Sequence, residues 1–408
     1  MINMKTILIL GAGKEQVYAI QLAKKKSIRT IAMDKNPRAE GSHYADEFHC
    51  ISTRDPESII KFLGGYSKKI DGVMTIASDI PHCVSAVAEF LHIPHIPLSV
   101  ANTCVHKLRM KEVLQKGTVN VPAFTKIKSN MDLLSFIDKV GYPVVIKPVD
   151  NSGARGVLYL TRDVDIDWAF DYAKTHSFSG DVMAEKFISG LQISTEGIML
   201  NDIFHCTGFA DRNYERMEQF APHIIEDGAN MPTALDSQGK LRVEREFEKA
   251  IRVLGIDWGP AKGDMVLGVD GQAYVVEIAA RLSGGNFCYD QVPLAYGVDI
   301  VDILIDMSVG NDVDAKRFEP IRNFATAQRY FFPPPGRVVE IRNIPAAEGV
   351  THIKKVDIWV KPGDTIPDTI SHPSRVGYVI ACAPTKQEAV DAAERAIRTI
   401  EFILERVS

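Results

Sequence analysis

The sequence has few cysteines, and no two of them stand at a spacing that suits a metal site or a redox motif. None is part of a C-x-x-C pair, and no cysteine–histidine spacing suits zinc. The pattern therefore offers no zinc module and predicts reduced thiols in a cytoplasmic protein, most of them in the core. The six cysteines are scattered along 408 residues: Cys50, Cys83, Cys104, Cys206, Cys288 and Cys382.

The sequence also lacks an excess of basic residues and any long apolar run. There are 47 Lys and Arg residues against 52 Asp and Glu residues, which leaves a formal net charge of −5. Nucleic acids and anionic membranes need a clustered basic footprint, so neither is expected as the main partner. The apolar stretch within residues 1–10 is too short, and too soon followed by glycine, to be a signal or transmembrane segment. We therefore expect a cytoplasmic protein whose anionic ligands meet local cations.

The first hundred residues alternate strand-like and helix-like segments. Apolar runs at Thr6–Leu10, Thr30–Met33 and Gly72–Ala77 are separated by helical stretches. Strands separated by helices predict a doubly wound α/β domain with a parallel sheet. Two prolines within His92–Pro97 interrupt this pattern and indicate a boundary.

The remainder predicts further domains, because 408 residues allow two to four of them at roughly 100 to 200 residues each. A mixed region extends to about residue 310, and β-like runs broken by glycine and proline begin at Phe324–Phe332. Thr385 and Glu388 fit a capping box that opens a closing helix. Alanines and isoleucines follow at helical spacing, so an α+β segment ends the chain.

A glycine turn after the first strand is a candidate dinucleotide site. Gly11 and Gly13 stand where such a site needs them, and Asp34 ends the next strand. The third fingerprint glycine is replaced by Gln16. The turn is therefore either a weak nucleotide-binding signal or a plain strand-to-helix turn in which Asp34 contacts something else.

A second candidate is Lys147, which ends the apolar run Pro143–Pro148. A lysine there is poorly hydrated unless it has an anionic partner, and the loop Asp150–Gly156 follows with two glycines and Arg155. Backbone amides of such a loop can cradle phosphates while cations neutralise them. The spacing is not that of a P-loop. The alternative is a snorkelling lysine beside an ordinary turn.

The segment Asp264–Glu277 permits a geometric prediction. Asp270 and Gly271 form a strong two-residue hairpin signal, and the numbers of paired residues in such a hairpin add to 541. Asp264 and Glu277 satisfy this sum, so they should face each other directly. The same register assigns Val266, Ala273 and Val275 to the face of the carboxylates, and to the opposite face Met265, Leu267, Tyr274 and Val276.

Two directly opposed carboxylates repel each other unless something lies between them. A divalent cation completed by phosphate oxygens would turn the repulsion into a site, because Mg²⁺ commonly uses one or two carboxylates and substrate phosphates. The alternative is an exposed hairpin end screened by water. Arg281 should share the face of Glu277, and its planar fork suits a carboxylate or a phosphoryl group. The amides of the turn Ser283–Gly285 could meet an anion.

Together these residues resemble the ATP-grasp superfamily, in the branch with biotin carboxylase, carbamoyl-phosphate synthetase and the L-amino-acid ligases. The resemblance implies a multidomain α/β and α+β fold. Its parts would be a Rossmann-like pre-ATP-grasp domain at 1–97, a two-part ATP-grasp domain at 98–315 with a lid at about 124–185, and a C-terminal α+β domain at 316–408. The positions that match the family's ATP-binding residues are Lys107, Lys147, Ser152, Gly153, Gly156, Glu185, Lys186, Ile188 and Gln192.

The resemblance also implies a metal site and a substrate pocket. Asp264 and Glu277 match the Mg²⁺ ligands, with Mn²⁺ as a substitute, while Ala279 stands where many relatives have a liganding asparagine. Gln192 replaces a glutamate that usually binds ribose. Lys147 and Arg281 match catalytic positions. Residues implied to lie near the substrate are Arg212, Glu226, Arg281, Ser283 and Gly284.

The resulting hypothesis is an ADP-forming carboxylate–amine ligase that works through an acyl phosphate, with small-molecule acid and amine substrates. An amino acid is the expected acid or amine, and a homodimer is compatible with the resemblance. Two alternatives within the fold are a purine-pathway ligase acting on a ribonucleotide and a bicarbonate-using carboxylase. An NAD(P)-dependent oxidoreductase is the alternative from another class.

Overall fold

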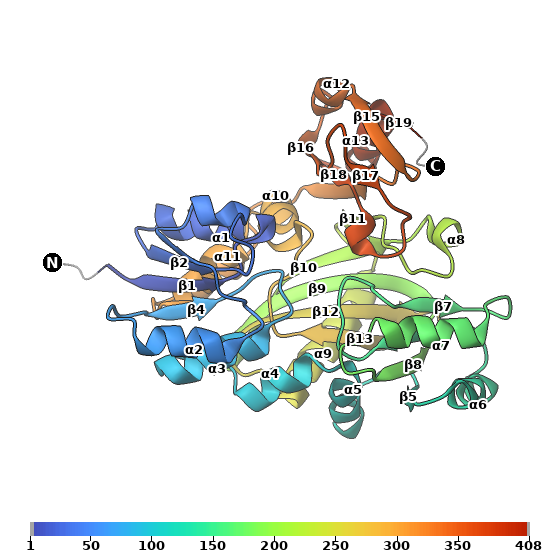
Figure 1. Ribbon diagram of the computed structural model, residues 1–408, viewed down its shortest axis with the longest axis horizontal. Helices are drawn as coiled ribbons and strands as arrows, with labels where there is room; N and C mark the ends of the chain where they lie inside the picture. The colour runs from blue at the N-terminus through green and yellow to red at the C-terminus, as the bar shows by residue number, and fades with distance from the viewer. Residues whose placement is uncertain (1–3, 406–408) are drawn as a thin grey trace.

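The computed structural model describes residues 4–405 and forms four β-sheets with helices packed on them (Figure 1). Four of the six cysteines are buried, as expected for reduced core thiols. No helix within residues 4–405 combines the length and the apolar character needed to cross a membrane.

The N-terminal sheet is parallel, as predicted, with strand order β3-β2-β1-β4. Alternate residues of β1 enter two cores, since Ile7 packs on one face and Leu8 on the other. The first core also contains residues of α11, from much later in the chain, and the second contains residues of α2 and α3. The elements are β1 (Thr6–Leu10), α1 (Lys14–Lys25), β2 (Arg29–Met33), β3 (Glu47–His49), α2 (Pro56–Gly64), β4 (Gly72–Met74), α3 (Pro81–Leu91) and α11 (Ile300–Ser308).

A second sheet of four antiparallel strands, in the order β5-β8-β6-β7, forms most of the segment expected to be the lid. Its apolar face packs on α6 and α7, where Phe136 and Phe170 share a core with Val144. Lys147 lies near the end of β6, as the sequence predicts. The elements are β5 (Phe124–Ile127), α6 (Asn130–Val140), β6 (Val144–Pro148), β7 (Leu158–Leu160), α7 (Ile166–Thr175) and β8 (Val182–Lys186).

The largest sheet has eight antiparallel strands in the order β13-β12-β9-β10-β11-β14-β18-β16. Phe247 of α9 and Leu114 of α5 cover one face near β12 and β13. The elements are α4 (Leu98–Cys104), α5 (Lys107–Lys116), β9 (Gly190–Leu200), β10 (Ile203–Asn213), α8 (Met217–Phe220), β11 (Gly228–Met231), α9 (Ser237–Leu254), β12 (Gly259–Gly268), β13 (Ala273–Ala279), α10 (Val292–Tyr296), β14 (Ala325–Tyr330), β16 (Ile353–Ile358) and β18 (Gly377–Ala383).

This sheet continues without a break from the middle of the chain into its C-terminal part, because β14 pairs with β11 on one side and β18 on the other. The C-terminal part adds a three-stranded sheet and the predicted closing helix, whose capping box at Thr385 and Glu388 is confirmed. We retain the division at 1–97, 98–315 and 316–408 as a proposal. The added elements are β15 (Gly336–Arg342), α12 (Ile344–Glu348), β17 (Thr365–Ile366), α13 (Lys386–Thr399) and β19 (Glu401–Glu405).

Candidate active site

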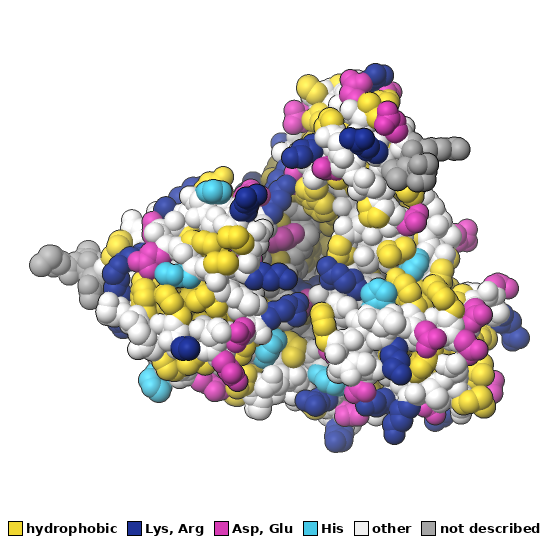
Figure 2. Space-filling view, viewed as in Figure 1, with side chains coloured by type: hydrophobic (Ala, Val, Ile, Leu, Met, Phe, Trp, Pro, Cys, Tyr) yellow, Lys and Arg dark blue, Asp and Glu magenta, His cyan; other side chains and the backbone are white. Residues whose placement is uncertain are grey.

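A cavity of about 900 Å³ lies where the N-terminal sheet, the lid sheet, the large sheet and the C-terminal part meet. Figure 2 shows the molecule hollowed near its middle, with Lys and Arg side chains around the opening. Eight Lys and Arg residues and six Asp and Glu residues line the cavity. A basic excess in a chain with a net charge of −5 indicates a site for an anionic ligand.

The structure brings nearly all predicted site residues together around this cavity. The exception is Gly156, the last residue of the loop Asp150–Gly156, which we call the glycine loop. Gly156 is buried with a φ of +73°, and a Cβ there would lie 2.5 Å from the Cβ of His176. The predicted residues that line the cavity are Lys107, Lys147, Ser152, Gly153, Glu185, Lys186, Ile188, Gln192, Arg212, Glu226, Asp264, Glu277, Arg281, Ser283 and Gly284.

The predicted phosphate lysines have carboxylate partners. Lys147 ion-pairs with Glu185, which also lies 2.7 Å from the Nζ atom of the fully buried Lys111. Burial alone would raise the pKa of Glu185, but Lys111 and Lys147 outweigh it and lower the pKa to about 2. Burial lowers the pKa of Lys111 to about 8, and Glu185 only partly offsets this. Lys107 at the start of α5 lies 3.2 Å from Glu277 and donates to the Asn151 carbonyl at 2.7 Å.

The glycine loop lies beside these lysines. Gly153 has a φ of +66°, in the left-handed region that glycine adopts readily. Its carbonyl accepts from the backbone N–H of His372 at 3.1 Å. His372 belongs to the C-terminal part, so this loop is held from across the cavity. At the neighbouring wall, Gln192 donates to the Ile188 carbonyl at 3.4 Å.

Asp264 and Glu277 are a directly opposed pair, which confirms the prediction. The turn of the hairpin is longer than predicted. Leu267 pairs with Ala273, so the turn has three residues instead of two, and its Gly271 has a φ of +77°. A β-bulge then adds Val276 opposite the Asp264–Met265 step and restores the predicted pairing.

The bulge also changes which side chains share a face. Val266 and Val276 line the cavity with the carboxylates, whereas Ala273 and Val275 lie in the core on the opposite face together with Met265. The prediction was therefore wrong for Ala273, Tyr274, Val275 and Val276, because the extra residue shifts the alternation of the strand by one position and pairs Tyr274 with Val266.

Neither carboxylate needs a metal to relieve repulsion. Asp264 Oδ1 forms ion pairs with Lys262 and with Arg212, the latter at 3.1 Å. Glu277 Oε1 forms an ion pair with Lys107. Burial opposes ionisation of Asp264, but Arg212 and Lys262 keep its pKa well below the usual value. Within residues 4–405, no three His, Cys, Asp or Glu side chains gather into a metal site of their own.

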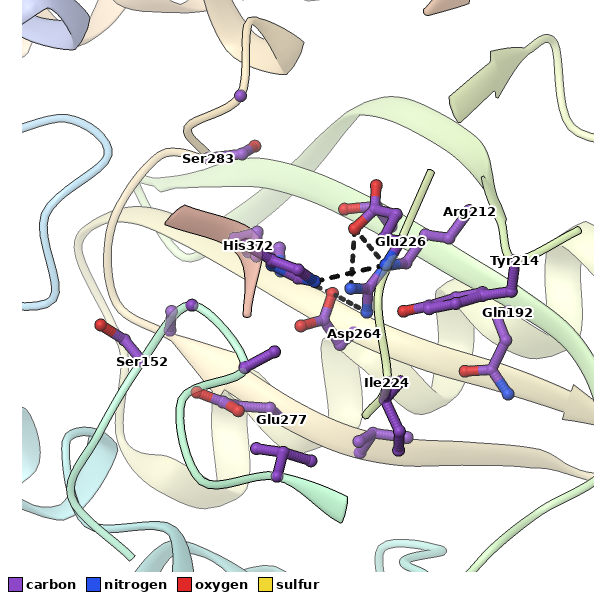
Figure 3. Close-up of a pocket in the computed structure, with 18 of the residues that line it drawn as sticks. Ser152, Gln192, Arg212, Tyr214, Ile224, Glu226, Asp264, Glu277, Ser283 and His372 are labelled. Carbon is purple, nitrogen blue, oxygen red and sulfur yellow. Dashed lines mark hydrogen bonds and ion pairs between the residues drawn. The ribbon is translucent and has the colours of Figure 1, made fainter. Parts of the chain in front are cut away.

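The same carboxylates still fit a hard cation. The second oxygen of each, Asp264 Oδ2 and Glu277 Oε2, accepts no hydrogen bond from the described residues, and the ion pairs run through Oδ1 and Oε1. Both side chains line the cavity, and Figure 3 shows them on neighbouring strands. Two such oxygens, completed by phosphate oxygens, are the donor set that Mg²⁺ or Mn²⁺ accepts.

Beside Asp264, Arg212 and Glu226 form an ion pair with Nη2 to Oε2 at 2.8 Å (Figure 3). The Nε2 atom of His372 accepts from the Glu226 backbone N–H at 3.4 Å. Burial, with Arg375 and Arg212 nearby, lowers the pKa of His372 well below its usual value. The histidine is therefore neutral at physiological pH.

The turn that follows β13 donates hydrogen bonds to two carboxylates of the protein itself. Ser283 donates from its backbone N–H and its hydroxyl to the fully buried Glu196, and the Gly285 N–H donates to Glu15 at 3.1 Å. These two amides are thus occupied, contrary to the expectation that they meet an external anion. Burial raises the pKa of Glu196 to about 7 despite the hydrogen bonds from Ser283.

The glycine turn after β1 is a strand-to-helix turn. Gln16 folds back over Gly11, where a Cβ would lie 3.0 Å from the Gln16 side chain, and donates to the Ile76 carbonyl at 2.7 Å. Asp34 accepts from the Ala12 N–H at 3.1 Å, inside the turn itself. The side chain that reaches the cavity from this turn is Glu15.

Several residues that line or support the cavity were not predicted from the sequence. Lys111 is fully buried and pairs with the cavity residue Glu185. It could have been found, because it follows Lys107 by four positions and therefore shares its face of the helix. The others reach the site through contacts between distant segments, which no local pattern reveals. These are Glu15, Asp79, His372 and Arg375.

Three family models match successive parts of the chain. Residues 7–89 match a PylC-like N-terminal domain, residues 104–285 an ATP-grasp domain, and residues 329–405 the L-amino acid ligase C-terminal domain 2. The chain therefore contains an ATP-grasp domain followed by the C-terminal domain of an L-amino acid ligase. It is therefore an enzyme that forms C–N bonds.

Individual relatives of this ATP-grasp ligase are distant. It is 25% identical over 362 residues to the uncharacterized protein y4rH of Sinorhizobium fredii, covering 86% of this chain and 73% of that one. It is 21% identical over 322 residues to the alanine–anticapsin ligase of Bacillus subtilis, covering 73% and 66%. The fold resembles an L-amino acid ligase from Bacillus licheniformis with a TM-score of 0.82 at 18% identity, over 98% and 99% of the chains.

Proposed function

We propose that this enzyme joins a carboxylate to an amine in an ADP-forming reaction that passes through an acyl phosphate, with an amino acid as a substrate. The observation that carries the proposal is the cavity that brings the lysines and the glycine loop together with Arg212, Glu226 and Arg281. Its basic excess suits a polyphosphate. The match of residues 329–405 to the L-amino acid ligase C-terminal domain 2 supports an amino-acid substrate.

Lys107 and Lys147 would bind the phosphates of ATP, and the loop at Ser152 and Gly153 would close over them. Glu185, with the backbone of Lys186 and Ile188, would bind adenine, and Gln192 would bind ribose through a neutral hydrogen bond. Lys107 and Lys147 would exchange part of their contact with Glu277 and Glu185 for phosphate oxygens. Such an exchange costs little, because one anion replaces another.

Mg²⁺ bound at the free oxygens of Asp264 and Glu277 would neutralise charge on the phosphates. Because Ala279 offers no ligand atom, these two carboxylates are the protein ligands that we propose.

In the first step, a carboxylate oxygen of the acid attacks the γ-phosphorus and ADP leaves. In the second, the amine nitrogen attacks the acyl carbon, phosphate leaves with one oxygen of the acid, and the nitrogen loses a proton. Arg281 and Lys147 would disperse charge on the transferred group, since phosphoryl transfer depends on positioning and electrostatics. The closed loop would keep water from hydrolysing the intermediate.

The side chain at the glycine turn argues against a ribonucleotide substrate. Such a substrate would need additional cations for its phosphate. Glu15 reaches the cavity from this turn instead, and Lys14 Nζ ion-pairs with Asp357. A carboxylate at this position repels phosphate and attracts an ammonium group.

Phosphate and ADP release from Mg-ATP, screened over pairs of the common L-amino acids, tests the proposal. ADP release that depends on two amino acids is expected. Turnover with a purine ribonucleotide but with no amino acid would refute the substrate class. Stabilisation against heat by NAD(H) or NADP(H), without stabilisation by ADP, would refute the ligase. A cytoplasmic location and a homodimer remain proposals that gel filtration and cell fractionation can test.

A further inference from the structure

Most of the charged residues that line the cavity form ion pairs with one another. Of the six acidic side chains that line it, Glu15 has no ion-pair partner among the described residues, because its contacts are the Gly285 N–H and the Tyr289 hydroxyl at 2.9 Å. The five with ion-pair partners are Asp79, Glu185, Glu226, Asp264 and Glu277.

The same comparison among the eight basic side chains singles out Arg375. Five of them hold those carboxylates, Lys186 Nζ donates to the Gly141 and Tyr142 carbonyls of the lid, and Arg155 is exposed on the glycine loop. Arg375 has no carboxylate within ion-pair distance in the described part of the chain. The five paired cations are Lys107, Lys147, Arg212, Lys262 and Arg281.

Arg375 is nevertheless held firmly at the cavity wall. Its guanidinium carbon lies 3.8 Å from the centre of the Tyr330 ring, and Nη2 donates to the Glu226 carbonyl. The Nε atom is buried and has no hydrogen-bond partner. A guanidinium fixed by an aromatic face and one carbonyl, with an unsatisfied N–H, is preorganised for a planar anion.

The segment that carries Arg375 is also anchored. The short helix η4 (His372–Ser374) precedes it, and the His372 backbone N–H donates to the Gly153 carbonyl at 3.1 Å. The His372 ring accepts from the Glu226 N–H. Arg375 therefore has a defined place between the glycine loop and the Arg212–Glu226 pair.

Glu15 lies near the other end of Tyr330. The Tyr330 hydroxyl would be 3.0 Å from a Cβ on Gly285, and the Gly285 N–H is the group that binds Glu15. One unpaired acid and one unpaired base thus flank the same tyrosine. This arrangement suits a ligand with both charges and disfavours a phosphate of charge near −2, which needs several cations.

We propose that Arg375 binds the free carboxylate of the amine-donating substrate, which is therefore an α-amino acid rather than a simple amine. This inference rests on the proposed function. The acid substrate uses its carboxylate at the phosphoryl group, so the carboxylate that persists through the reaction belongs to the amine. The terminal nitrogens of the Arg375 guanidinium, one of which also donates to the Glu226 carbonyl, would donate to this carboxylate.

The test compares free amino acids with their α-carboxamides as amine substrates, in wild type and in Arg375→Ala and Arg375→Lys. Wild type should prefer the free acid by about 100-fold in kcat/KM, because a half-buried guanidinium left without its anion costs affinity. Arg375→Ala should reduce this preference to within about threefold through a higher KM for the acid, with the KM for ATP unchanged. Arg375→Lys should keep part of the preference, since the charge remains without the fork.

Arg337→Ala is the matched control, because Arg337 is an exposed arginine of the same C-terminal part and does not line the cavity. Its preference for the acid should equal that of wild type. A folded Arg375→Ala or Arg375→Lys enzyme with an undiminished preference would overturn the inference and leave the proposed function intact. ADP release with a ribonucleotide and with no amino acid would overturn both.

Discussion

Arg281 donates from Nε to Asp79 Oδ1 at 2.6 Å, and its Nη2 atom lies 2.6 Å from the same oxygen. Arg281 follows β13 of the large sheet, and Asp79 lies between β4 and α3 of the N-terminal sheet. The guanidinium at the substrate end of the cavity is therefore held by a distant part of the chain. Its position depends on how the N-terminal sheet is placed.

Changing either partner should impair catalysis to different degrees. Arg281→Lys keeps the charge but loses the planar fork, and we expect kcat to fall by about 100-fold. Asp79→Asn leaves Arg281 intact but less well oriented, so we expect a loss of about tenfold. Steady-state phosphate release measures both. Wild-type kinetics in Arg281→Lys would show that this guanidinium does not hold the reacting groups.

Lys147→Ala should weaken ATP binding by at least about tenfold, because the phosphates lose a buried ammonium group. The variant should remain folded, since Lys111 still neutralises Glu185 at 2.7 Å. Calorimetric titration with Mg-ADP gives the affinity. Lys126→Ala, on the surface of the lid sheet, is the control, and unchanged affinity in Lys147→Ala would remove this lysine from the site.

Glu277→Gln should abolish ADP release while leaving the melting temperature within a few degrees of wild type. The amide keeps the shape of the side chain but is a poor ligand for a hard cation, and it no longer balances Lys107. Asp270→Asn, at the exposed tip of the same hairpin, is the control and should turn over normally. Retained turnover in Glu277→Gln would count against the metal assignment.

Glu196 should make stability depend on pH. Burial raises its pKa from 4.5 to about 7 in the folded state, so its contribution is fully present below about pH 4.5 and is lost as the pH rises through 7. The loss amounts to about 3 kcal/mol. Glu196→Gln is permanently neutral and should be the more stable protein at about pH 8, with little difference at about pH 5. Urea unfolding at both values measures this, and parallel pH profiles would contradict it.

The hairpin shows how far sequence reasoning reached. The opposed carboxylates were predicted from a two-residue turn, and the structure arrives at the same pair through a three-residue turn and a bulge at Val276. The longer turn and the bulge each shift the register by one residue, and the two shifts cancel at Asp264 and Glu277. This pair was therefore predicted correctly. Between the turn and the bulge only one shift applies, so the faces predicted for residues 273–276 were wrong. Turn length and bulges depend on packing against neighbouring strands, which a local pattern does not contain.

The substrate end of the cavity was less predictable. Arg212 and Glu226 were expected there from the resemblance, and they line the cavity as an ion pair. His372 and Arg375 were not expected, because they lie about 150 residues further along and reach the site only through the fold. Lysines at the ends of strands and helices leave a signal in the sequence, whereas loops that cross between segments leave none.

The pairing of β14 with β11 has a consequence for protein engineering. One way to alter substrate choice would be to exchange the C-terminal segment for that of a related enzyme. Such an exchange would interrupt a continuous ladder of backbone hydrogen bonds. A chimera would need its junction before β14 and a graft whose edge strand matches Gly228–Met231, residue for residue. Replacing only the short crossover at His372–Ser374, together with Arg375, leaves that ladder untouched and is the safer route.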